Sequence, residues 1–170
     1  FNHAQCQAAD VNSVKATIVK HAIEMGVDPA IALSIARTES GFRHEARSAH
    51  GAVGVFQLMP STARRMGYNH YSLNDNIKAG ITYYKKMYNM FGSVELALAA
   101  YNAGPGNVKR YNAVPPYGET RRFVSKIMSD VNRQKVNPDP AFIKARQGVY
   151  TAQKPKAVIP KATVHKPASK

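Results

Sequence analysis

Apolar residues recur every three to four positions along most of this chain, which is the period of a helix with one buried face. The first such stripe covers residues 12–25, and Gly26 follows it as a helix stop. Asp28 and Pro29 then form a typical helix start, and a second stripe continues to Glu39. The pattern therefore predicts two amphipathic helices within the first 40 residues.

The pattern changes after the second helix. Residues 41–60 contain several glycines and only a weak alternation, which favours a loop or a short β-hairpin. Ser61 is then expected to cap a short helix. Asn74 or Asp75 is expected to cap a longer helix, which ends at Gly92 and has four residues on its buried face: Ile77, Ile81, Tyr84 and Tyr88.

Two more helical stripes follow before the pattern fades. Ser93 begins a stripe formed by Val94, Leu98 and Tyr101. We expect residues 104–107, Gly-Pro-Gly-Asn, to stop this helix and form a turn. The last stripe begins near Glu119 and continues through Phe123, Ile127 and Val131. Two prolines interrupt the chain after Asn137, and a weak helical stretch is predicted to reach about Tyr150.

Length and composition divide the chain into two parts. The 170 residues are 44% hydrophobic, which is enough for one globular domain with a core. We expect a compact, mainly α domain over residues 1–136 and a weakly structured to disordered tail over residues 137–170. From Thr151 onward the tail contains five Lys, three Pro and no acidic residue, a composition typical of disorder. No apolar run is long enough for a transmembrane helix.

The net charge of +14 predicts attraction to polyanions, such as nucleic acid, anionic lipid or the bacterial wall. Cys6 is the single cysteine and forms no internal disulfide, and the six histidines show no metal-ligand spacing. We therefore expect no metal or other cofactor, and we assume a monomer. The chain begins with Phe1 and shows no signal-peptide pattern, so we expect a processed or trimmed product.

A carboxylate ends the second stripe. Glu39 follows Ile31 and Ile35 at intervals of four residues, which places it on the core-facing side of its helix. A carboxylate in that position is costly unless it is partnered or protonated, and burial raises its pKa. Enzymes hold a general acid near neutral pH in this way. The simpler interpretation is a solvated glutamate, or one paired with Arg43.

Five short motifs occur in order along the chain: Glu39-Ser40, Gly54-Val55-Phe56-Gln57-Leu58-Met59-Pro60, Asn76-Ile77-Lys78-Ala79-Gly80, Ala100-Tyr101-Asn102-Ala103-Gly104 and Pro116-Tyr117-Gly118-Glu119-Thr120. A serine-containing turn, residues 48–52, precedes the second motif. Together they resemble the motifs of the soluble lytic transglycosylase family, over roughly residues 14–131. The family usually has Met where this chain has Phe56, from which we expect only a local change in cleft packing.

This resemblance implies a lysozyme-like α+β fold and an enzyme that cleaves peptidoglycan. It makes Glu39 the sole catalytic acid/base, which protonates the glycosidic oxygen between N-acetylmuramic acid and N-acetylglucosamine. The carboxylate then takes the proton from the C6 hydroxyl of the same sugar, and that oxygen attacks C1. The implied product is a 1,6-anhydro end, formed without consuming water.

The resemblance also implies supporting or substrate-binding roles for five residues: Ser48, Gln57, Tyr101, Asn102 and Glu119. The Ser48 hydroxyl would hold the substrate N-acetyl group or orient Glu39. Gln57 has a donor and acceptors for sugar groups, and Tyr101 lies on a buried stripe, so part of its role is packing. For Glu119 the alternative is a first-turn acid favoured by the helix dipole.

Two other functions are compatible with these residues. A hydrolysing muramidase would use the same acid with a second carboxylate, Glu119 or Asp75, to position water. Glu45 is expected to be solvated. A cationic binding module without catalysis would explain the charge, although the chain carries no nucleic-acid-binding motif. We expect action on glycan strands in the periplasm or cell envelope, or with a phage, in the service of a secretion, conjugation or phage assembly.

Overall fold

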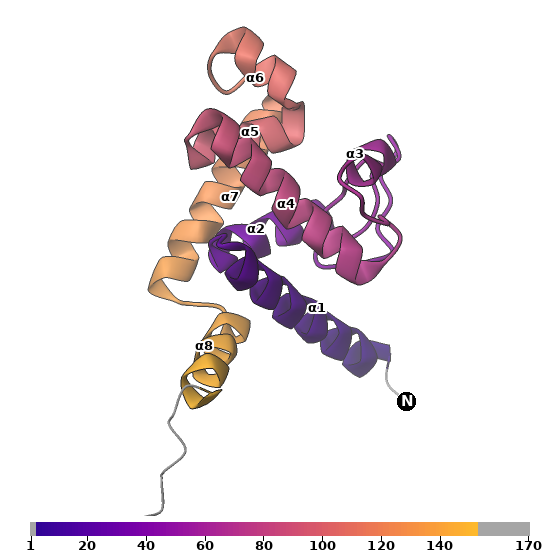
Figure 1. Cartoon of the computed structure of the whole chain (residues 1–170), viewed down its shortest axis with the longest axis vertical. Helices are drawn as coiled ribbons and strands as arrows, with labels where there is room; N and C mark the ends of the chain where they lie inside the picture. Colours follow the sequence, from indigo (N-terminus) through magenta and orange to yellow (C-terminus); the bar gives the residue numbers. More distant parts are fainter. Residues whose placement is uncertain (1–2, 153–170) are drawn as a thin grey trace, which may run out of the picture.

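The computed structural model describes residues 3–152, which form eight helices and one long loop after the second helix (Figure 1). In chain order the helices are α1 His3–Met25, α2 Pro29–Ser40, α3 Pro60–Arg65, α4 Leu73–Phe91, α5 Val94–Ala103, α6 Pro105–Tyr111, α7 Gly118–Val136 and α8 Pro140–Ala152. Within this part of the chain, no helix is long and apolar enough to cross a membrane. The predicted mainly α fold is confirmed.

The core lies where five helices face one another. Helix α2 packs between α1 and α7, while α5 packs against α4, α6 and α7. In Figure 1, α6 and α8 lie at opposite ends of the molecule, with α2, α4 and α7 between them. Each central helix contributes fully buried aliphatic side chains, among them Ile18, Leu33, Ile77, Leu98 and Ile127. Burial of the predicted stripes therefore supplies the main stabilisation of the fold.

Several predicted helix ends are confirmed. The Asp28 side chain accepts a hydrogen bond from the backbone nitrogen of Ala30 at 2.9 Å, and Pro29 is the first residue of α2. Ser93 caps α5 by accepting from the backbone nitrogen of Leu96 at 3.3 Å. Gly92 ends α4 in the left-handed conformation, at a φ of 70°. Local sequence is sufficient at these positions because caps and stops act on neighbouring residues.

Three predicted helix starts are wrong. Helix α1 begins at His3 rather than near residue 12. The N-cap position of α3 is Met59 rather than the predicted Ser61. Met59 has an extended backbone, and Pro60 follows it as the first helical residue. Ser72, rather than Asn74 or Asp75, caps α4, and its side chain accepts from the backbone nitrogen of Asp75. The structure gives no local reason for the early start of α1.

Two further predictions need correction. Residues 104–107 are not a simple turn, because Gly104 both ends α5 and precedes α6, which begins at Pro105. Gly104 has a φ of 88°, a value that glycine adopts without steric cost. Tyr88 is exposed rather than part of the buried face of α4.

The predicted loop after α2 is confirmed. It contains two isolated antiparallel bridges, Arg47 to Val53 and Val53 to Leu58.

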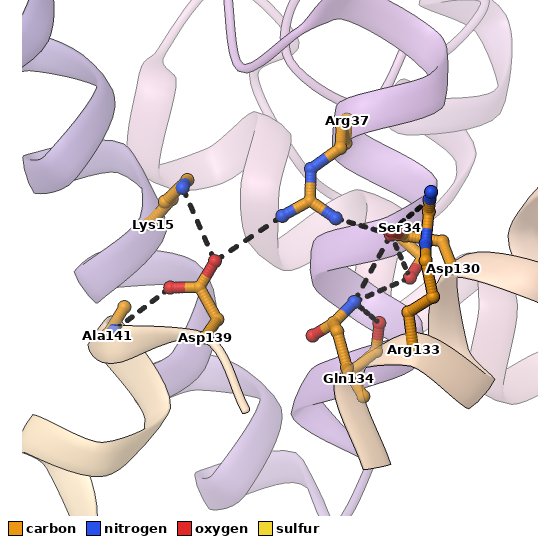
Figure 2. Close-up of polar contacts among 9 residues, drawn as sticks. Lys15, Ser34, Arg37, Asp130, Arg133, Gln134, Asp139 and Ala141 are labelled. Carbon is orange, nitrogen blue, oxygen red and sulfur yellow. Dashed lines mark hydrogen bonds and ion pairs between the residues drawn. The ribbon is translucent and has the colours of Figure 1, made fainter. Parts of the chain in front are cut away.

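Helix α8 is joined to the helical core by an ion-pair network (Figure 2). Asp139 accepts from Lys15 of α1 and from Arg37 of α2, both at 3.3 Å. Asp139 also accepts a hydrogen bond from the backbone nitrogen of Ala141 at 2.9 Å, at the start of α8. The predicted domain boundary at residue 136 stays a prediction. The sequence predicts disorder from Thr151 onward, but residues 151 and 152 still belong to α8. The rest of that predicted segment lies outside the described residues.

Candidate active site

Glu39 lies in the last turn of α2 and is half-buried. Among the described residues, no hydrogen bond or ion pair involves its carboxyl group. Arg43 does not pair with it, because the Arg43 Nε donates instead to the backbone oxygen of Ser40 at 2.9 Å. The interpretation of Glu39 as one half of an ion pair with Arg43 is therefore wrong.

The surroundings of Glu39 favour its neutral form. Burial, and secondarily the negative charge of Glu119 on α7, raises the pKa of the Glu39 carboxyl from 4.5 to about 8. At neutral pH this group therefore carries its proton. A protonated carboxylic acid with a pKa close to working pH can donate a proton and accept it back.

The loop that follows α2 is fixed beside Glu39 by side chains from three helices. The Ser40 hydroxyl of α2 donates to the Val55 oxygen at 2.7 Å. Asn76 of α4 accepts from the Phe56 nitrogen at 3.0 Å and donates to a second loop carbonyl. The Tyr101 hydroxyl of α5 donates to the Phe56 oxygen at 2.7 Å. Backbone groups of the loop thus find hydrogen-bond partners on helices rather than in a sheet. Side chains of α2, α4 and α5 therefore set the position of the loop.

Two glycines let this loop approach α4 closely. A Cβ on Gly80 of α4 would lie 2.2 Å from Cγ of Phe56, whose ring is fully buried. A Cβ on Gly54 would lie 2.6 Å from Nδ2 of Asn76. Gly54 also has a φ of 82°, so a side chain is excluded there by both sterics and backbone conformation. Both motif glycines are therefore explained by close packing of loop on helix.

Gln57 and Ser48 take part in the loop itself. Gln57 has a φ of 47°, an uncommon conformation for a non-glycine residue. Its Nε2 donates to the oxygens of Ala46 and Gly54, at 3.0 and 2.8 Å. The exposed Ser48 accepts from the nitrogen of Ala52 at 2.9 Å, and its own proton stays available to donate. Neither side chain hydrogen-bonds to Glu39 within the described residues.

Tyr101 and Asn102 connect α5 with the loop after α2 and with α7. Tyr101 is buried, and its ring stacks on Phe123 of α7 with centroids 6.2 Å apart. Burial raises the pKa of Tyr101 well above 10.0, with a further contribution from Glu39. Asn102 accepts a hydrogen bond from the Thr120 hydroxyl at 2.9 Å, one residue after Glu119. The structure therefore places Tyr101 and Glu119 in the electrostatic environment of Glu39.

Sequence reasoning missed three residues that hold the loop and the start of α7 in place around Glu39. Ser40, Asn76 and Thr120 all occur in the quoted motifs, yet none was predicted to have a role. Their positions within the motifs were the signal that could have found them. Their hydrogen bonds to distant segments explain why the motifs contain these residues. Among the described residues, no group of three or more His, Cys, Asp or Glu side chains could hold a metal ion.

Comparison with known proteins places this arrangement in a family. The chain is 30% identical to a transglycosylase of Enterobacteria phage PRD1, over 76% of this chain and 47% of that protein. It is 33% identical to a soluble lytic murein transglycosylase of Salmonella typhimurium, over 61% of this chain and 20% of that protein. The chain thus spans less than half the length of these relatives.

Solved structures agree with this placement. An inactive glutamate-to-glutamine mutant of the lytic transglycosylase Slt from Pseudomonas aeruginosa superposes with a TM-score of 0.63 and is 34% identical, over 74% of this chain and 25% of that one. The 70 kDa soluble lytic transglycosylase of Escherichia coli gives a TM-score of 0.60 at 27% identity, over 69% and 23%. The model of the transglycosylase SLT domain matches residues 16–123. The chain therefore belongs to the transglycosylase SLT domain family.

Proposed function

We propose that this chain is a lytic transglycosylase that cleaves the β-1,4 bond between N-acetylmuramic acid and N-acetylglucosamine in peptidoglycan. The observation that carries the proposal is the half-buried Glu39 carboxyl, which has no ion-pair partner in the described part of the chain and a pKa of about 8. The names of the relatives support the reaction class. The Pseudomonas aeruginosa relative is inactive as a glutamate-to-glutamine mutant, which supports an essential glutamate in that protein.

In the proposed reaction Glu39 acts twice. Its protonated form donates to the glycosidic oxygen as the bond from that oxygen to C1 of N-acetylmuramic acid breaks. The resulting carboxylate takes the proton of the C6 hydroxyl, and the C6 oxygen forms a new bond to C1. The donated proton leaves with the N-acetylglucosamine hydroxyl, and the proton from the C6 hydroxyl restores the acid form of Glu39. No water is consumed, and the new end is a 1,6-anhydro ring.

The surrounding residues have supporting roles in this proposal. Gln57 uses its amide nitrogen within the loop, so its oxygen is left to accept from substrate. The Ser48 hydroxyl has a proton to donate to the substrate N-acetyl group. Tyr101 excludes water from one side of Glu39 and keeps the loop in place. Asn102 contributes its amide nitrogen to substrate, and Glu119 helps to keep Glu39 protonated.

The position of Glu119 also supports a second candidate, a hydrolysing muramidase. Its charge acts on Glu39, and its side chain is exposed, so it is free to orient a water molecule. Asp75 is a weaker candidate for this role, because its carboxylate accepts from the Asn69 nitrogen at 3.0 Å beside the start of α4. The two candidate reactions use the same acid and differ in the group that attacks C1.

We propose a catalytic unit over residues 1–136 that works as a monomer on glycan strands of the periplasm or cell envelope, or with a phage. The phage PRD1 relative supports the last setting. The net charge of +14 supports attraction to wall anions. In this proposal the enzyme serves a secretion, conjugation or phage assembly.

The test is mass spectrometry of the soluble products released from purified peptidoglycan sacculi. We expect muropeptides that end in 1,6-anhydro-N-acetylmuramic acid, each lighter by one water than the corresponding hydrolysis product. Reducing ends would instead establish the muramidase and direct attention to Glu119. Strong salt-dependent binding without any released product would support the cationic binding module.

A further inference from the structure

Two of the exposed tyrosines form a pair at the surface. Tyr111 ends α6, and Tyr117 directly precedes α7. Their ring centroids are 5.8 Å apart and their planes meet at 86°, an edge-to-face arrangement. The exposed fractions are 40% for Tyr111 and 36% for Tyr117, so much of both residues faces solvent. Exposed aromatic rings that pack on each other present an apolar surface suited to binding.

Neighbouring side chains hold this pair in place. The Tyr117 hydroxyl donates to Oδ1 of Asn107 at 3.2 Å. The Nδ2 of Asn107 donates in turn to the oxygen of Ala103, at the end of α5, at 2.7 Å. The guanidinium group of Arg110 lies over the Tyr111 ring, 5.6 Å from its centroid. The rings are therefore oriented before any ligand arrives, which lowers the entropy cost of binding.

The pair adjoins the candidate active site. Tyr117 lies two residues before Glu119, whose charge reaches Glu39. The hydrogen bond from Thr120 to Asn102 fixes the start of α7 against the end of α5. In Figure 1, α6 extends beyond α5 at one end of the molecule. A polymer that runs from Glu39 past Glu119 would continue onto the tyrosine pair.

The chemistry of the pair fits a sugar ring. The chain has no tryptophan, so stacking on sugars has to come from tyrosine or phenylalanine. A pyranose has apolar C–H faces that pack on an aromatic ring, and its hydroxyls bond to phenol and guanidinium groups at the rim. We propose that Tyr111 and Tyr117 form a subsite that stacks on an amino-sugar ring of the glycan strand, away from the bond cleaved at Glu39. This inference rests on the proposed function.

The experiment measures binding rather than cleavage, in the full chain carrying Glu39→Gln. Isothermal titration calorimetry gives Kd for N-acetylglucosamine oligomers of three and six sugars. Tyr117→Ala and Tyr111→Ala are each expected to raise Kd for the hexamer about tenfold. The Kd of the trimer should rise less. Only the longer hexamer can occupy the Glu39 site and reach the two rings at the same time. A purely structural role would weaken both oligomers equally.

Two further variants separate stacking from other effects. Tyr117→Phe keeps the ring and removes only the hydroxyl, with its bonds to Asn107 and Tyr111, so Kd should stay within about twofold. Tyr88→Ala removes an exposed tyrosine of α4 that packs on Tyr84, and it should change neither constant. Tyr117 is partly exposed and makes no side-chain cap bond to α7, so Tyr117→Ala should remain folded at 25 °C, which a melting curve checks.

The outcomes distinguish the subsite from the proposed function. Unchanged hexamer binding in both alanine variants, with the parent chain binding normally, would overturn the subsite and leave the proposed function standing. An equal loss for trimer and hexamer would also overturn it. A parent chain that binds neither oligomer and no soluble peptidoglycan strand would overturn the subsite together with the proposed function.

Discussion

Helix α2 has carboxylates in opposite electrostatic environments on its two sides. Glu39, on α2 itself, has no cationic partner within residues 3–152, and its pKa is raised to about 8. Asp130 comes from α7 and lies against α2, where it accepts from Ser34 at 2.7 Å, from Arg133 at 2.8 Å and from Arg37 (Figure 2). Burial alone would raise the pKa of Asp130, but these hydrogen bonds and the Arg37 charge outweigh it, so its pKa lies below 3.8.

The difference shows that hydrogen-bond donors and a nearby cation can outweigh the effect of burial on the pKa of a carboxyl group. Burial acts on both residues in the same direction. Arg37 precedes Glu39 by two residues, and such positions are about 200° apart around a helix. The cation of α2 therefore points away from Glu39 and towards Asp130 and Asp139. One helix thus supplies a structural ion pair on one side and leaves a protonated acid on the other.

Removal of the Glu39 proton donor should have the largest effect. Glu39→Gln keeps the shape of the side chain but cannot donate and reclaim a proton. We expect the rate of muropeptide release from sacculi to fall by about 10³-fold or more, with the circular dichroism spectrum retained. A variant that turns over within about tenfold of wild type would remove Glu39 from the mechanism.

The Asp130 side of α2 should instead respond in stability. Asp130→Ala leaves the buried Ser34 hydroxyl without its acceptor and leaves Arg37 with Asp139 as its remaining acidic partner in the network, so the free energy of unfolding in urea should fall by about 3 kcal/mol. Glu45→Ala, at an exposed acidic residue of the loop, is the control and should change it by less than about 0.5 kcal/mol. If the two variants lose equal stability, the network in Figure 2 contributes nothing specific.

The two carboxyl groups should also give opposite dependences of stability on pH. Between pH 4.5 and about 8, folded Glu39 keeps a proton that the unfolded chain has lost, so stability falls as pH rises. Because the glutamine does not titrate, the stability of Glu39→Gln relative to wild type should rise by several kcal/mol, at most about 5 kcal/mol, across this range. For Asp130 the pKa is lowered, so its contribution is complete above pH 3.8 and is lost on acidification. Parallel unfolding curves for wild type and Glu39→Gln from pH 4.5 to 8 would contradict the raised pKa.

The smallest expected effect tests the link between Glu39 and Glu119. Activity should decline as pH rises through about 8, because the acid form of Glu39 disappears. Glu119→Gln removes a nearby negative charge and should move this midpoint down by less than about one pH unit. Glu95→Gln, in the first turn of α5, is the matched control and should leave the midpoint in place. A collapse of the maximal rate in Glu119→Gln would favour the muramidase instead.

The comparison also separates what could be predicted from sequence. Glu39 was found because its helix has a regular apolar stripe, and a residue at the same spacing inherits the same face. Asp130 and Asp139 gave no such signal. Apart from Arg133, which is close to Asp130 in sequence, their cationic partners are distant: Arg37, 93 and 102 residues away, and Lys15, 124 residues before Asp139. From the sequence alone, an exposed acidic residue cannot be distinguished from a buried, paired one, because the distant partners come together only in the folded structure.

The sequence by itself therefore determined the helices with strong period, their glycine stops and the burial of Glu39, because these depend on neighbours within one or two turns. The start of α6 at Pro105 and the cap at Ser72 are also local features, although the apolar pattern did not predict them. Only the tertiary structure decided the fixing of the loop by Asn76 and the pairing of Arg37 with Asp130 and Asp139. It also decided that Glu39 has no cationic partner among the described residues. Hydrogen bonds and charges between distant segments have no period along the chain, so their effect appears only when the packed helices bring them together.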